Sequence, residues 1–231
     1  MKAMIFSDLI TSKNVAVQLL LLSVVICGFF AWGMGETVVG TAAMATMTPM
    51  MYLFSIFAYD EMNGWERFRL TLPITKRQVA YGRYISMLII AVISLLAAWI
   101  VSFVFLAIVQ ACGGLGMSTE LVDPDTFVAI LDCGFAGFIF IIVLASLTLP
   151  FLMRFGMNKA TRLLPLLVVV TIVLASVAIG NMMSGAIDLT VIRTFLNENT
   201  GLIAAAACIV TAILYAASAF IAARLYQARE L

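Results

Sequence analysis

The chain has 231 residues, of which 64% are hydrophobic and only 11% are charged. An ordinary soluble domain is about half apolar and about a quarter charged, and a chain of this size cannot hide so much apolar surface from water. The composition therefore excludes a soluble enzyme, a nucleic-acid-binding protein and a disordered protein. Because the chain has no histidine, imidazole catalysis and histidine-ligated metal sites are excluded as well.

The first 14 residues carry an amphipathic pattern. Ile5, Phe6, Leu9 and Ile10 fill one arc of a helix, and polar residues fill the opposite arc. We therefore expect residues 1–14 to form a helix that lies in the inner interface of a membrane. A frayed terminal tail is the alternative.

Long windows without charged residues follow, and each is long enough to cross a bilayer. A hydrocarbon core about 30 Å thick needs about 20 helical residues. The windows are continuously apolar rather than alternating, which favours helices over barrel strands. The sequence therefore predicts an all-α integral membrane protein in a single domain, residues 1–231. Its six spans are expected at about 15–32, 38–58, 84–109, 127–152, 164–183 and 201–223.

The basic residues indicate how these spans are oriented. With the N-terminus inside, 12 of the 13 Lys and Arg residues fall in inner segments, and only Arg193 falls outside. Positive residues are retained on the cytoplasmic side, whereas the reverse topology would translocate nearly all of them. Both termini are therefore predicted to be cytoplasmic, in a multi-pass protein of the cell membrane.

Local signals predict where several helices begin. Thr75 and Gln78 fit a capping box that opens the third span. Pro124 fits the first position of the fourth helix, which suits a residue without a backbone N–H. A short basic inner loop is expected over residues 153–163, with Pro165 opening the fifth helix.

The inner loop, residues 59–83, is the longest inner segment. Apolar residues recur there at helical spacing from Met62 to Leu72, so a surface helix is predicted over residues 60–72. Pro73 ends it, because proline cannot continue the hydrogen-bond ladder. This helix would be the main cytoplasmic surface between the second and third spans.

Motifs for catalysis and nucleotide binding are missing from the chain. The sequence contains no GxxxxGK[ST], no GxSxG and no CxxC pattern. We therefore predict no enzyme activity and no catalytic, cofactor-binding or metal-binding residue on this chain.

The inner loop carries a family resemblance. Its stretch DEMNGWERFRLTLPITKRQVAYGRY, residues 60–84, resembles the loop after the second span of type 2 ABC transporter permeases. In that family an acid pair, a Trp-Glu-Arg core and a Leu-Pro-basic step lead into the third helix. The chain's small size is similar to the branch that exports phenol-soluble modulins and related bacterial peptides. One departure is Gly64, which weakens the surface helix by roughly 1 kcal/mol relative to Ala.

The resemblance implies the membrane subunit of an ATP-driven exporter of an amphipathic peptide or a hydrophobic small molecule, in a bacterial membrane. Two copies of a separate ABC ATPase would bind ATP and Mg²⁺, and a second permease, identical or paralogous, would complete the assembly; no nucleic acid is involved. The surface helix would be the coupling helix. Its expected ATPase-coupling residues are Asp60, Glu61, Trp65, Glu66, Arg67 and Arg69.

Two alternatives stay open at this point. The surface helix could instead lie on lipid, with its arginines on phosphate groups. The whole chain could be a membrane protein that transports nothing, such as an assembly factor or a sensor or immunity subunit. A neighbouring gene for a stand-alone ATPase would favour the exporter.

A group of methionines is predicted to line the cargo path. The four residues of this group are Met44, Met47, Met50 and Met51. Methionine side chains adapt to varied apolar partners, which suits a promiscuous surface. Plain packing or lipid contact is the alternative for all four.

Asp132 is a candidate for an outer gate. It lies near the start of its predicted helix, so it could equally reach the wet interface, where the helix dipole favours an acid. Nearby Cys112 and Cys133 could be bonded or free.

Small residues recur at four-residue spacing on the last span. Ala212 with Ala216, and Ala219 with Ala223, would let helices approach closely. The sequence leaves open whether the contact lies within one chain or between two permeases.

Overall fold

The computed structural model describes residues 10, 13–33, 37–62, 75–111, 124–181 and 200–227, with the backbone alone over residues 31–33, 62, 109–111, 124–125, 157–181, 200 and 202–203. These residues contain long helices and no strand. The helices are α2 (Lys13–Gly33), α3 (Thr37–Met62), α5 (Lys76–Ala111), α6 (Pro124–Asn181) and α8 (Thr200–Gln227). In the described residues 5 helices are long and apolar enough to cross a membrane. The predicted all-α membrane fold is therefore confirmed for this part of the chain.

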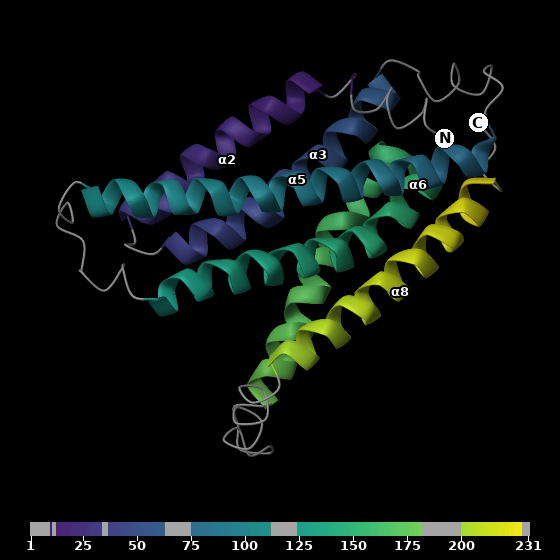
Figure 1. The fold of residues 1–231 in the computed structure, drawn as a ribbon. Helices are drawn as coiled ribbons and strands as arrows, with labels where there is room; N and C mark the ends of the chain where they lie inside the picture. Colours follow the sequence, from purple (N-terminus) through teal and green to yellow (C-terminus); the bar gives the residue numbers. More distant parts are fainter. Residues whose placement is uncertain are drawn as a thin grey trace.

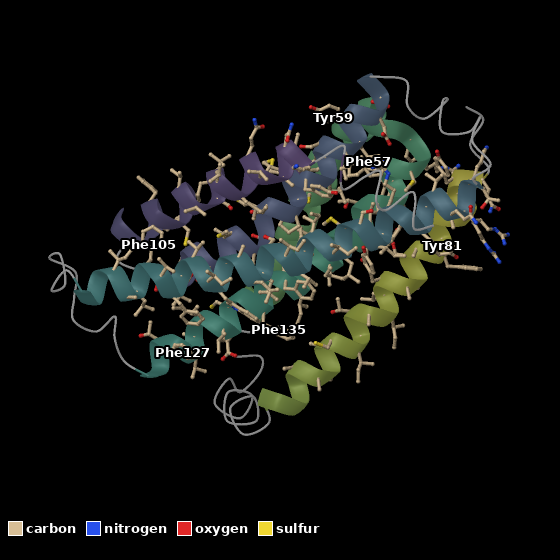
Figure 2. All side chains as sticks on the ribbon, turned by 45° about the horizontal axis from the view of Figure 1, so that its top comes forward. Phe57, Tyr59, Tyr81, Phe105, Phe127 and Phe135 are labelled. Carbon is tan, nitrogen blue, oxygen red and sulfur yellow. The ribbon has the colours of Figure 1, made fainter. Side chains whose placement is uncertain are left out.

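Consecutive helices run in opposite directions, so their ends gather at two ends of the bundle (Figure 1). α3 ends, α5 begins and α8 ends on the same side, which we call the basic end. Figure 2 shows nitrogen atoms gathered there, where α5 begins and α8 ends. The basic side chains that the structure describes belong to this end: Lys13, Lys76, Arg77, Arg83, Arg154 and Arg224. This segregation is what the positive-inside rule expects, although which side of a membrane the end faces stays a prediction.

The largest departure from the sequence prediction lies in α6. The expected inner loop at 153–163 is helical except at Gly156, where φ is 73° and ψ is 170°. Glycine adopts a positive φ without the steric penalty of a Cβ atom. A single residue therefore reverses the chain where a loop was predicted.

Two arms of α6 meet at this reversal (Figure 1). The first arm, residues 124–155, contains the predicted fourth span. The second arm, residues 157–181, runs back from the basic end and covers most of the predicted fifth span, 164–183. Pro165 lies inside the second arm instead of opening it, a position that membrane helices tolerate.

Two helix starts agree with the sequence signals. The Gln78 backbone N–H donates to Thr75 Oγ at 3.4 Å, and the Thr75 N–H donates to the Gln78 side-chain oxygen at 3.3 Å. This capping box is confirmed, and it starts α5 at Lys76, well before the predicted span at 84–109. Pro124 is the first residue of α6, as predicted.

Glycines on the first arm of α6 allow α3 and α5 to approach closely. A Cβ atom on Gly134 would collide with the indole of Trp99 in α5. A Cβ atom on Gly137 would lie 3.2 Å from the Ala42 carbonyl oxygen in α3. The largest core cluster lies nearer the basic end, between α3, α5, the first arm of α6 and α8.

Two predicted segments fall mainly outside the described residues. They are the interfacial helix at residues 1–14, of which the structure describes residues 10, 13 and 14, and the coupling helix at 60–72, of which it describes residues 60–62 as the end of α3. Both stay predictions.

Gly156→Ala tests the single-residue reversal. An Ala held at φ 73° and ψ 170°, a region that is almost exclusive to glycine, costs about 1–3 kcal/mol, so the free energy of unfolding in mixed micelles should fall by about that amount. Gly201→Ala is the matched control, because its added methyl group would meet nothing within 4 Å. A Gly156→Ala protein as stable as the Gly201→Ala protein would contradict the positive φ.

Candidate functional site

An ion pair joins the end of α3 to the first turns of α5. The Arg83 guanidinium contacts the Asp60 carboxylate, and their side chains are only 3% and 10% exposed. The ring of Phe57, labelled in Figure 2, lies under the guanidinium, with 5.1 Å from its central carbon to the ring centroid. This is a cation–π distance. Both neighbours therefore hold the Arg83 charge in place.

Burial makes this pair energetically important. An exposed ion pair contributes about 0–1 kcal/mol. A buried charge loses its hydration, so removing one partner of a buried pair costs about 3–5 kcal/mol. Asp60 and Arg83 must therefore stay together, and they fix the spacing of α3 and α5 at the basic end.

The residue after Arg83 makes the corresponding link to α8. The Tyr84 hydroxyl lies 2.8 Å from Ser218 Oγ. The Ser218 hydroxyl in turn donates to the Ser146 carbonyl in the first arm of α6. Tyr215 of α8 donates from its hydroxyl to the Tyr84 carbonyl at 2.8 Å. These hydrogen bonds connect α5, α6 and α8.

α5 is thus the common partner of its neighbours at the basic end. Successive residues of a helix point about 100° apart, so Arg83 reaches α3 while Tyr84 reaches α8. At the first turn of α5, Lys76 Nζ also donates to the Gln227 carbonyl at the end of α8, at 3.4 Å. The start of α5 is therefore tied directly to both α3 and α8.

The structure alters the setting of the predicted coupling residues. α3 continues to Met62, so the expected surface helix does not begin at Asp60. Asp60 lies buried in the last helical turns of α3, and Glu61 beside it is half-buried. The other predicted coupling residues, Trp65, Glu66, Arg67 and Arg69, lie outside the described residues. Their contact with an ATPase stays a prediction.

Sequence reasoning missed Arg83 and Tyr84 as site residues. Arg83 was counted only as an inner positive charge. A usable signal existed, because Asp60 and Arg83 are opposite charges beside the facing ends of two consecutive spans. Tyr84 carries no comparable signal, since its role depends on where α8 packs.

The predicted cargo-path methionines lie on different sides of α3. Met44 is buried beside α2 and α5, and Met50 packs against the main core cluster. Met47 and Met51 are 51% and 52% exposed. The structure therefore brings together only the exposed pair on one outer face, and the cargo path stays a prediction.

Asp132 and Cys133 lie on the first arm of α6, toward the end away from the basic end. The Asp132 side chain is exposed, and Cys133 is half-buried and free. Cys112 lies outside the described residues, so the outer gate and the disulfide stay predictions. No group of three or more metal-ligating side chains converges within the described part of the chain.

Asp60→Asn tests the ion pair. It leaves the Arg83 guanidinium buried without its counter-charge, so the free energy of unfolding should fall by about 3–5 kcal/mol. The double variant Asp60→Leu with Arg83→Met should recover much of this loss, because no unpaired charge remains.

Arg154→Gln is the control for this measurement, since Arg154 is exposed at the same end and its replacement should change stability by about 0.5 kcal/mol or less. Denaturant titration in mixed micelles measures all the variants. An Asp60→Asn protein no less stable than the control would show that the ion pair does not hold α3 and α5 together.

A comparison with protein families gives a match over nearly the whole chain. The model of a family described as ABC-2 family transporter protein matches residues 3–227, which include α3, α5 and the ion pair between them. No curated protein and no solved structure matches the chain significantly. The predicted resemblance to type 2 ABC transporter permeases is thereby confirmed, and the chain belongs to the ABC-2 family of transporter permeases.

Proposed function

We propose that this permease is the membrane-spanning half of an ATP-driven exporter that works with a separate ABC ATPase. Family membership supports a membrane subunit of an ABC transporter. The sequence has no P-loop pattern, so ATP and Mg²⁺ would bind to the partner. The partner would then supply the work, and this chain would convert it into movement of helices.

The Asp60–Arg83 pair is the observation that carries this proposal. Residues 63–74 connect the end of α3 to the capped start of α5. An ATPase that displaces this segment would act on two helix ends that the ion pair holds together. The force would therefore move α3 and α5 as a unit, and Tyr84 would pass it to α8.

The cargo is proposed to be an amphipathic peptide or a hydrophobic small molecule. Proton-driven carriers and ion channels place ionisable groups on the path through the membrane. In this chain the predicted spans 38–58 and 84–109 contain no charged residue. The exposed Met47 and Met51 offer an adaptable apolar surface that suits such a cargo.

A pair of permeases with two ATPases is the proposed assembly, with the path between the permeases. The cavities beside Arg83 and beside Thr48 hold about 10 Å³ each, and two hollows between α5 and α8 hold about 230 and 300 Å³; none of these has room for an amphipathic helical peptide. Ala219 and Ala223 are buried in this chain's own core, so they contribute to packing within the chain. A second permease would supply the facing wall, and rocking of the two halves would alternate access.

The combination Trp65→Ala with Arg69→Ala tests the coupling segment. In proteoliposomes that contain the permease and its ATPase, a labelled amphipathic helical peptide should stimulate ATP turnover by the wild type. The double variant should lose this stimulation, because large aromatic and arginine side chains dominate interface energies. Membrane insertion should be unchanged.

Arg154→Ala with Phe155→Ala is the matched control, an exposed arginine–aromatic pair at the same end, with 5.6 Å between guanidinium and ring. It should keep the stimulation. Full stimulation in the Trp65→Ala, Arg69→Ala protein would disprove the role of residues 63–74. If no ABC ATPase combined with the wild-type permease showed peptide-stimulated ATP turnover, the proposed export function would be contradicted.

A further inference from the structure

A two-lobed groove lies between α5 and α8. One lobe holds about 230 Å³ and is also lined by the first arm of α6. The other holds about 300 Å³ and lies nearer the basic end. Both lobes are lined by Leu88, Tyr215 and Ala216, so they adjoin each other, and we call the two together the α5–α8 groove. Each lobe approaches the lower limit of about 300 Å³ that is usual for ligand pockets.

The walls of the α5–α8 groove suit a hydrocarbon chain. Leu88, Ile142, Ala212 and Ala216 line it with aliphatic carbon. The Tyr84 and Tyr215 hydroxyls, which also lie at the groove, are engaged in hydrogen bonds within the bundle. The cavity therefore gives little recognition to a polar ligand along its length.

Cations lie at the end of the groove that is nearest the basic end. Arg77 is exposed, and it precedes Tyr81, Ile85 and Leu88 on the same stripe of α5, at spacings of four, eight and eleven residues. Tyr81 lines the lobe nearer the basic end, and Figure 2 labels it near the gathered nitrogen atoms. Tyrosine is typical of the headgroup level of a membrane.

α8 supplies the second cation. Arg224 is exposed and lies two turns beyond Ala216, with its guanidinium 4.5 Å from the Phe220 ring centroid. Neither α5 nor α8 contains an Asp or Glu residue. The mouth of the groove is therefore positive on both sides.

We propose that the α5–α8 groove binds an anionic phospholipid from the leaflet at the basic end. One acyl chain lies along the groove, and the phosphate group lies between Arg77 and Arg224. Basic pockets between membrane helices recognise anionic headgroups in this way. The site requires no ATPase and no cargo, so it stands apart from the proposed transport activity.

Charge argues against a second copy as the occupant. Two copies in one membrane place the same end on the same side, and a symmetric contact brings each surface against itself. Arg77 and Arg224 would then face the partner's arginines with no acid on either helix, and such like-charge contacts are costly. An anionic lipid supplies the missing counter-charge.

Native mass spectrometry of the full-length detergent-purified protein tests the proposal. The protein is titrated with dioleoyl phosphatidylglycerol and, separately, with dioleoyl phosphatidylcholine. Phosphatidylglycerol should bind more tightly than phosphatidylcholine. Arg77→Gln and Arg224→Gln should each lower the affinity for phosphatidylglycerol by about fivefold. Neither substitution should lower the affinity for phosphatidylcholine to the same extent. Ala216→Phe, which fills the groove, should weaken both lipids.

Arg154→Gln is the control, an exposed arginine on α6 outside the groove; it should leave both affinities unchanged. Circular dichroism checks that each variant is folded. If Ala216→Phe does not fold, the Arg77→Gln and Arg224→Gln proteins decide the result. Equal affinity of the wild type for both lipids would overturn the proposal. An equal loss of phosphatidylglycerol affinity in Arg154→Gln would also overturn it. So would an Ala216→Phe protein in which a dimer of the chain dissociates while lipid stays bound.

Discussion

A carboxylate and a guanidinium that are withdrawn from water can stay charged only if they remain together. In this permease they are Asp60 near the end of α3 and Arg83 in the second turn of α5, both nearly buried. Because separating them would strand a charge in apolar surroundings, the pair is a firm connection between the two helices. Residues 63–74 connect the end of α3 to the start of α5, the two helix ends near which the pair lies. The position of the pair therefore determines how a force on that segment would reach the rest of the bundle.

Further polar contacts continue this connection along α5. Ser94 donates to the Met44 carbonyl of α3 at 3.1 Å, and Ser102 Oγ lies 2.6 Å from Thr41 Oγ. Such contacts matter inside a membrane, because lipid tails are as apolar as side chains and the hydrophobic effect does not drive helices together. With the ion pair, they link α3 and α5 from the basic end toward the opposite one.

Much of the fold follows from the sequence, because hydrocarbon tolerates so few kinds of residue. Charge-free windows predicted long apolar helices, of which 5 are found in the described residues, and the Thr75–Gln78 capping box and Pro124 marked two helix starts. The reversal at Gly156 was not predictable, since one glycine can replace a loop only if the packing of both arms of α6 allows it. Pro165 predicted a helix start, whereas the second arm of α6 is already helical from residue 157.

The candidate site was predictable only in part. The acid at Asp60 was singled out, but as part of a surface helix, because local spacing says nothing of which charges become buried. Assigning positive residues to the inner or outer side of the membrane does not identify a partner for Arg83. Its partner emerges only when the two helices are placed together. The four methionines show the same limit, since α3 turns some of them into the core and others outward.

The proposed coupling requires that α3 and α5 move as one body when an ATPase partner acts on residues 63–74. Spin labels at Tyr59 and Ile85, both exposed on these helices, report the distance between them by pulsed electron spin resonance. In the complex with its ATPase, the distance distribution should be the same without nucleotide and with trapped ATP, and it should broaden in Asp60→Asn. A nucleotide-dependent shift larger than the width of the wild-type distribution would contradict the claim.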